Sequence, residues 1–283
     1  MGEAVITVPE LAAEALGSFL ADQITRRFGS TDAALTELIP SAARLALECI
    51  GNSDALYHNV EHTMLVTLAG YDIMRGRALL IPTDATDFAH LIFACLFHDI
   101  GYVRGILEGD GPDGYVIDAK GGKTKLPRGA SDAALIAYHV DRSKLFVMDR
   151  LATSKFVDAA RIARAIEFTR FPPQELDDKH KEEGMLVRAA DLIGQLADVN
   201  YLRKIPALFS EFEETGANQK LGYRSSADLR AKYPEFFWTV VSPYIGDALR
   251  YLSLTQEGKL WISNLYSHVF SQEHRHRLLD MES

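Results

Sequence analysis

The chain has 283 residues, 47% of them hydrophobic and 24% charged, a composition typical of a folded globular protein. Its formal net charge of −9 argues against a binding surface for duplex nucleic acid, which would need a basic face. Two cysteines do not indicate a disulfide framework, and the first residues lack the basic start of a signal peptide. No apolar run reaches the roughly 18 residues of a membrane span. We therefore expect a cytoplasmic protein that does not enter a membrane.

Apolar residues recur at helical spacing along most of the chain, and strand-like alternation is nearly absent. We therefore expect an all-α fold, a single helical domain over residues 1–283. The expected helices, in chain order, are Val8–Phe28, Ala33–Ile50, Val60–Met74, Thr86–Ile100, Asp132–Val140, Val157–Phe168, Glu182–Leu202, Ile205–Thr215, Pro234–Leu254 and Leu260–Arg277. Gly101, directly after Ile100, suits a left-handed helix stop.

The clear interruption is the glycine-rich segment 104–130, which we expect to be a long loop without regular structure. Loops of this length in compact domains are usually functional or disordered. Its second half carries four cations: Lys120, Lys123, Lys125 and Arg128. They form either a mobile rim that attracts an anionic substrate or a solvated surface excursion.

The segment LIFACLFHDIG, residues 91–101, is apolar on every side up to Phe97 and then presents His98 and Asp99. Burying two ionisable groups costs roughly several kcal/mol unless a partner or a metal ion offsets this cost. A metal site is one explanation, and a self-satisfied His–Asp hydrogen bond is the other.

Two further segments carry ionisable groups on helices. In YHNVEH, residues 57–62, His58 and His62 are four positions apart and so share one helix face. Such a pair could converge on one ion, although it also occurs by chance on solvated helices. Asp191 lies in the otherwise apolar segment MLVRAADLIG, where its partner is either a metal ion or Arg188 one turn earlier.

Together these segments supply a mixed nitrogen and oxygen ligand set, His62, His98, Asp99 and Asp191. Such a set suits Mn, Fe, Co, Ni, Zn or Mg rather than a thiolate-loving ion. It also leaves coordination positions for water and a phosphate oxygen, which supports Lewis-acid chemistry.

The order of these motifs resembles the HD superfamily of metal-dependent phosphohydrolases, and more narrowly the catalytic domain of cyclic-nucleotide phosphodiesterases. YHNVEH is similar to the family's Y-H-N-x-x-H, FHDIGY to its H-D-x-x-H-x-G, and RAADLIG to its motif around a late aspartate. Fainter likenesses lie in SDAALIAYHVDRSKLF, IEFTRF and FFWTVVSPYIGDAL. The resemblance covers roughly residues 40–255 and implies an HD-domain helical bundle with extra helices at both ends.

The resemblance gives ligand roles to His62, His98, Asp99 and Asp191, and it makes His58 the acid that protonates the leaving oxygen. Asp99 or Asp191 would also orient the attacking water. Tyr57 and Asn59 would shape the start of the helix that carries His62.

This chain departs from the family pattern around the second ion. Tyr102 stands where the family has the second histidine of H-D-x-x-H. Phe146, Val147, Met148 and Asp149 stand where it has Glu followed by Asn-His-His. We therefore expect one tight metal site and a second that is weak or absent. The faint match for the purine-binding glutamine falls near Pro234, so base recognition does not transfer.

Other polar residues could line a substrate pocket, with ordinary core or surface roles as the alternative: Tyr102, His139, Gln195, Lys123, Lys125 and Arg170. The expected substrate is a small phosphate ester, a nucleotide or a cyclic nucleotide, cleaved by metal-activated water. A non-catalytic regulatory module that keeps the fold, and a two-iron oxygenase, are the alternatives. The oligomeric state stays open, with a homodimer as one arrangement.

Overall fold

The computed structural model describes residues 6–29, 33–173 and 181–274. Thirteen α-helices and almost no strand are found in these parts of the chain, so the expected all-α class is confirmed. The helices, in chain order, are α1 (Val8–Phe28), α2 (Ala33–Ile50), α3 (Val60–Arg77), α4 (Ala85–Phe97), α5 (His139–Arg150), α6 (Ala159–Glu167), α7 (Lys181–Leu196), α8 (Tyr201–Glu214), α9 (Ala217–Leu221), α10 (Ser226–Ala231), α11 (Tyr233–Phe236), α12 (Ser242–Leu252) and α13 (Gln256–Glu273). Helix α11 is a single turn that runs directly into the π-helical turn η4 (Phe237–Val241) and on to α12.

The expected helix end near the candidate ligands, and the expected conformation of Gly101 after it, are both wrong. Helix α4 ends at Phe97 rather than Ile100, and the 3-10 turn η2 (Ile100–Tyr102) follows Asp99. Gly101 does not adopt a left-handed conformation. It is needed for close packing instead, because a Cβ atom on it would lie 2.0 Å from the carbonyl oxygen of His139.

Three other expected helices are divided. Asp132–Val140 is a 3-10 turn, η3 (Asp132–Leu135), followed by the start of α5 at His139. Glu182–Leu202 breaks after Leu196, because Asp198 accepts a hydrogen bond from the backbone N–H of Asn200 in a turn. Pro234–Leu254 contains η4 between α11 and α12. The end expected at Arg277 lies outside the described residues.

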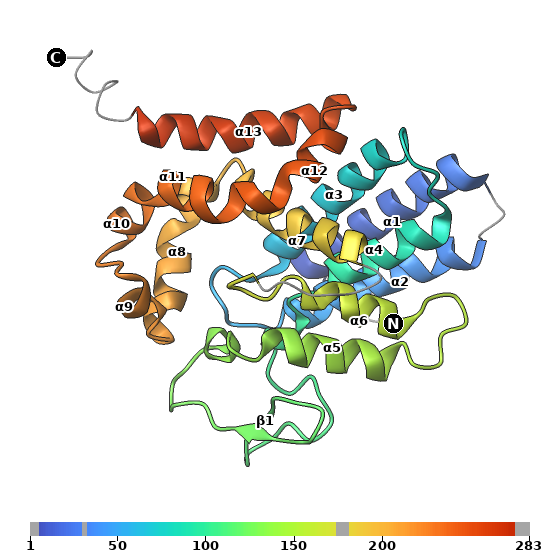
Figure 1. Ribbon diagram of the computed structural model, residues 1–283. Helices are drawn as coiled ribbons and strands as arrows, with labels where there is room; N and C mark the ends of the chain where they lie inside the picture. The colour runs from blue at the N-terminus through green and yellow to red at the C-terminus, as the bar shows by residue number, and fades with distance from the viewer. Residues whose placement is uncertain (1–5, 30–32, 174–180, 275–283) are drawn as a thin grey trace.

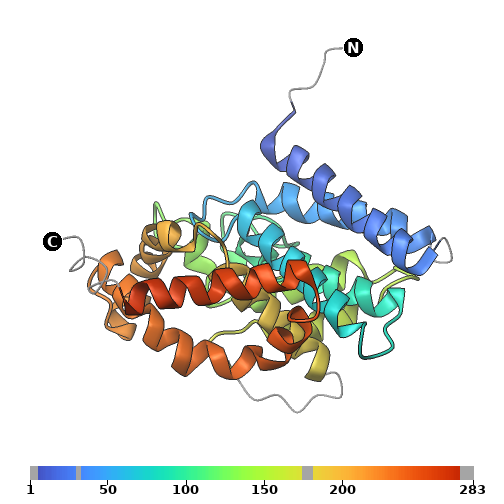
Figure 2. The same ribbon diagram turned by 90° about the horizontal axis from the view of Figure 1, so that it is seen from above.

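Helices α3, α4 and α7 form the centre of the molecule (Figure 1). Helices α1 and α2 pack against each other as an antiparallel pair on one side, and α12 and α13 lie side by side on another, as both views show (Figure 2). Helix α4 is buried along its whole length, in agreement with its uniformly apolar sequence. This helix delivers His98 and Asp99 into the interior.

The glycine-rich segment is more ordered than expected, because it contains a short antiparallel hairpin of β1 (Tyr115–Val116) and β2 (Lys123–Thr124). Arg142 of α5, fully buried, holds this segment. Its guanidinium donates to the carbonyl oxygens of Val103 and Val116 and forms an ion pair with the buried Asp110 at 2.9 Å. The expectation of a loop without regular structure is therefore wrong for this part of the segment.

Within the described residues, no helix is both long and apolar enough to cross a bilayer.

Candidate metal centre

Four ligand atoms from three separate segments meet in the interior. The Nε2 atoms of His62 and His98 lie 3.3 Å apart, and each lies 3.2 Å from Oδ2 of Asp99. Oδ1 of Asp191 lies 3.5 Å and 3.6 Å from the same two nitrogens. Two ligands that each lie about 2.1 Å from one ion are about 3.0–3.4 Å apart. The imidazole and carboxylate atoms are therefore spaced as ligands of an ion. His62, His98 and Asp191 form one group that could hold a metal ion, and Asp99 joins His62 in a second group that also contains His58.

The helix starts and ends explain how these side chains reach one point. Asn59 caps α3, its side chain accepting from the backbone N–H groups of Glu61 and His62, which confirms the expected role of Asn59. His98 and Asp99 lie in the turn after α4. Ser143 of α5 ties this turn down, because its hydroxyl donates to the carbonyl oxygen of His98 and accepts from the N–H of Gly101.

The hydrogen bonding of these side chains fits a bound cation. Nδ1 of His98 donates to the carbonyl oxygen of Cys95 at 2.7 Å, which leaves the lone pair of Nε2 for an ion. Oδ2 of Asp99 is buried and accepts no hydrogen bond of good geometry from the described residues. A buried carboxylate oxygen without a donor is costly, and a cation between Asp99 and the two imidazoles would satisfy it.

The pKa values show how strongly these groups need positive charge. Burial alone would raise the pKa of Asp99, but the adjacent positive charge of His98 holds it well below the ordinary range. Burial likewise opposes protonation of His98, but the negative charges of Asp99 and Asp191 raise the pKa of His98 to about 9. Without an ion, a proton on the imidazoles provides the charge that the carboxylates require.

His58 lies beside this group and is held by Glu211 of α8. Its Nδ1 lies 2.6 Å from Oε2 of Glu211, whose Oε1 accepts from the backbone N–H groups of Tyr57 and His58. A ring nitrogen of His58 is within 4.8 Å of ligand atoms of His62 and Asp99. Since Nδ1 is engaged, Nε2 is the nitrogen left to face the centre.

Glu211 sets the protonation of His58. Burial would lower the pKa of His58, but the charge of Glu211 and its hydrogen bond raise it above the ordinary value. Glu211 is only 2% exposed, and its pKa is lowered despite burial because His58 and the two backbone N–H groups stabilise the carboxylate. Sequence reasoning missed Glu211, which lies 153 positions after His58 in a helix that also carries other acidic residues.

Tyr102 is stacked between His58 and His139. Its ring centroid lies 4.6 Å from that of His58 and 4.4 Å from that of His139, with interplanar angles of 19° and 12°. Nδ1 of His139 donates to the carbonyl oxygen of Ile136, and Nε2 lies 3.6 Å from Oδ1 of Asp99. Tyr102 is buried, so it acts here as a packing ring between two imidazoles, and His139 faces the centre.

The other predicted residues lie in different surroundings. Gln195 hydrogen-bonds the hydroxyl of Tyr201. Lys123 and Lys125 are exposed on the hairpin segment, and Arg170 forms ion pairs with Asp141 and Glu167. Asp191 faces the imidazoles, whereas Nε of Arg188 donates to the carbonyl oxygen of Phe168.

Residues 6–275 match the Npun_R2479-like family. The chain belongs to this family. The match spans all the elements that carry the candidate centre, from α3 to α8. No curated protein matches the chain.

Proposed function

We propose that this chain is a metal-dependent phosphohydrolase of the HD superfamily that cleaves a phosphate ester, such as a nucleotide or a cyclic nucleotide. The observation that carries the proposal is a buried ligand set with an unsatisfied carboxylate oxygen, beside His58, whose Nδ1 lies 2.6 Å from the buried Glu211 so that Nε2 is left to donate a proton. A structural ion site would have no use for such a proton donor.

Four residues would hold the cation: His62, His98, Asp99 and Asp191. A divalent ion bound there would polarise a phosphate ester and lower the pKa of a water molecule. Asp99 and Asp191 supply the negative charge that orients such a water. The buried surroundings exclude bulk solvent from the imidazoles, since His62 and His98 are almost fully buried.

His58 would donate the proton from Nε2 to the leaving oxygen as its bond to phosphorus breaks. Glu211 raises the pKa of the imidazole and fixes its orientation through Nδ1. General acid catalysis of this kind contributes about 10²–10⁴-fold in rate. The raised pKa of His58 favours the acid form of its imidazole.

The test is elemental analysis of the purified chain, followed by assays of phosphomonoesters, phosphodiesters and cyclic nucleotides with each of the candidate divalent ions. We expect bound metal and turnover of at least one class. His58→Ala should keep the metal and lose about 10²–10⁴-fold in kcat. Bound metal without any turnover would instead support the regulatory module. Absence of metal under all conditions would refute the proposal.

A further inference from the structure

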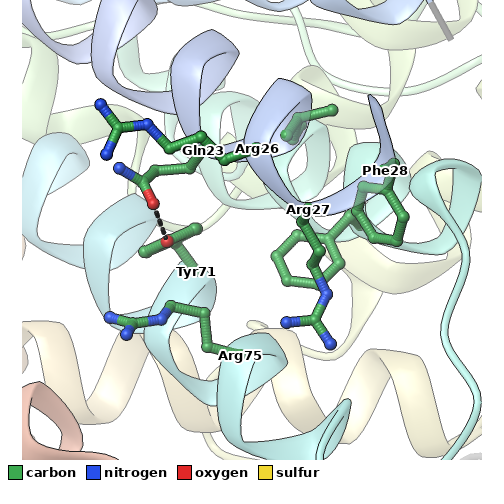
Figure 3. Close-up of a pocket in the computed structure, with 8 residues that line it drawn as sticks. Gln23, Arg26, Arg27, Phe28, Tyr71 and Arg75 are labelled. Atoms are coloured by element: carbon green, nitrogen blue, oxygen red, sulfur yellow. Dashed lines mark hydrogen bonds between the residues drawn. The ribbon is translucent and has the colours of Figure 1, made fainter. Parts of the chain in front are cut away.

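A separate cavity of about 190 Å³ lies between α1, α3 and α4 (Figure 3). It shares no residue with the candidate metal centre. Tyr71 and Arg75 of α3 line it, and Arg75 lies about 20 Å along the helix from His62 at a rise of about 1.5 Å per residue. The cavity is therefore distinct from the proposed active site.

The charge of this cavity is opposite to that of the whole chain. Its eight lining residues include three arginines, Arg26, Arg27 and Arg75, and no acidic residue, although the chain carries a net charge of −9. Figure 3 shows Arg26 and Arg75 on the side of Tyr71 and Arg27 on the side of Phe28. The other lining residues are Ile24, Phe28, Tyr71 and Phe88, which are apolar or aromatic, and the polar Gln23.

Arg27 is held in place by contacts that leave most of its hydrogen-bond donors unused. Arg27 lies over the rings of Phe28 and Phe88, 5.6 Å from each centroid, and donates one hydrogen bond to the carbonyl oxygen of Ala78. A guanidinium has five N–H donors, so most of those of Arg27 stay available. No carboxylate of the described residues forms an ion pair with Arg26 or Arg27.

Arg75 is positioned in a similar way. It lies over the ring of Tyr71 at 5.6 Å and forms ion pairs with Asp72 at 3.1 Å and Glu257 at 3.3 Å. Both pairs use the same nitrogen, NH1. The remaining donors of the guanidinium are free to bind a ligand in the cavity.

We propose that this cavity binds a small phosphate-like anion. Guanidinium groups match the oxygens of phosphate in geometry and charge. The volume is below the roughly 300–1,000 Å³ of pockets that hold drug-sized ligands, which favours inorganic phosphate or a small phosphomonoester over a nucleotide. The hydroxyl of Tyr71, hydrogen-bonded to Gln23, supplies a polar group in the wall.

Arg26 and Arg27 also lie in the last turn of α1, where positive charge stabilises the helix dipole. Lysine would serve that purpose equally well, but it lacks the planar fork that stacks on aromatic rings and binds phosphate through two donors. Arg27→Lys and Arg75→Lys therefore separate an anion site from helix stabilisation, because both keep the charge.

The experiment is calorimetric titration of the full chain with inorganic phosphate and, separately, with glycerol 3-phosphate. Both titrations are performed in an Asp99→Ala background, which removes binding at the metal centre. We expect one binding step that persists in this background and weakens at least tenfold in Arg27→Lys or Arg75→Lys. Arg77→Lys, on the same helix but outside the cavity, is the control and should bind as the parent does.

The preference between the two probes identifies the occupant as free or esterified phosphate, and binding of either probe supports the site. No binding in the Asp99→Ala background, or affinity that the two Arg→Lys variants leave unchanged, would overturn the proposal. Circular dichroism of each variant establishes that the fold is retained. Failure of this test leaves the proposed hydrolase function untouched, since the metal centre is disabled throughout.

Discussion

Glu211 and His58 form a buried acid–imidazole pair in which Oε2 lies 2.6 Å from Nδ1, and the other carboxylate oxygen accepts from the backbone N–H groups of Tyr57 and His58. Three contacts thus fix the imidazole and the chain around it. The pair joins α8 to the segment just before α3 and so places the proposed acid beside the ligands of the metal centre.

Glu211→Gln should lower the pKa of His58, because it removes the negative charge that raises this pKa. The alkaline limb of the kcat/KM profile follows deprotonation of His58, so it should move to lower pH. Above that limb kcat/KM should fall about 10–100-fold, whereas metal content should stay the same.

Glu61→Gln is the matched control, since Glu61 is an exposed carboxylate at the start of α3 that pairs with Lys204. Its pH profile should equal that of the wild type. An unchanged alkaline limb in Glu211→Gln would show that His58 is not the proton donor, even if the rate fell for other reasons.

Asp99→Ala should abolish metal binding, because it removes a ligand and leaves His62 and His98 facing each other at 3.3 Å without their anion. Mass spectrometry of the metal content measures this. Asp72→Asn is the control, because Asp72 is also buried but interacts with Arg75 and Trp261 at the far end of α3. Full metal occupancy in Asp99→Ala would exclude Asp99 as a ligand.

Metal uptake should release a proton and strengthen with pH. The pKa of His98 in the metal-free chain is raised to about 9, so the imidazole is protonated at neutral pH, and an ion must displace that proton. Apparent affinity should therefore rise about tenfold per pH unit up to about pH 9 and then level off. Titrations at several pH values, with proton release followed in weak buffer, test this; pH-independent affinity would contradict it.

The stability of the metal-free chain should fall as the pH rises, whereas its metal affinity should increase. The pKa of His98 is about 9 in the folded chain and 6.5 in the unfolded chain. Protonated His98 therefore contributes its full stabilisation below pH 6.5, and this contribution is lost as the pH rises through about 9. Thermal melts of metal-free protein should therefore decline over that range. Asp99→Ala, without the carboxylate that raises this pKa, should show a smaller decline.

Arg142→Ala should destabilise the fold by about 3–5 kcal/mol, because it leaves the buried Asp110 unpaired together with the carbonyl oxygens that Arg142 satisfies. Urea denaturation measures this. Arg150→Ala, at the exposed end of α5, should cost less than about 1 kcal/mol. Equal losses in the two variants would mean that Arg142 does not anchor the glycine-rich segment.

The all-α fold could be predicted, and the four candidate ligand residues could be singled out, because these signals are local. Helical periodicity depends on residues three and four positions apart, and the pair His98–Asp99 directly follows the apolar sequence of α4. The ends of the helices are harder to predict from the sequence. The apolar pattern of α7 runs on through Ala197, and only the turn at Asp198 stops it.

Glu211 and Arg142 could not be predicted, because their roles depend on contacts between distant segments. Glu211 is one of several acidic residues in α8, and only the fold places it against His58. In the sequence Arg142 looks like an ordinary surface arginine between Asp141 and Ser143. Only its burial in the structure shows that it holds the glycine-rich segment. The sequence shows that Tyr102 departs from the family pattern, but the stacking of its ring between His58 and His139 depends on the fold.

The number of metal ions is the property for which His139 matters most. The sequence predicts one tight site, because Tyr102, Phe146 and Met148 offer little support for a second ion. The structure adds His139, whose Nε2 lies 3.6 Å from Oδ1 of Asp99, on the opposite oxygen from the main ligand set. Asp99 and His139 would be the only two ligands of a second ion among the residues described above, and two are fewer than a transition metal needs for tight binding.

We therefore expect one high-affinity step in a metal titration and a second, much weaker step. His139→Ala should remove the weak step and leave the first unchanged. If His139→Ala weakens the first step instead, His139 belongs to the tight site. Two steps of similar high affinity in the wild type would show that the chain holds a firm pair of ions.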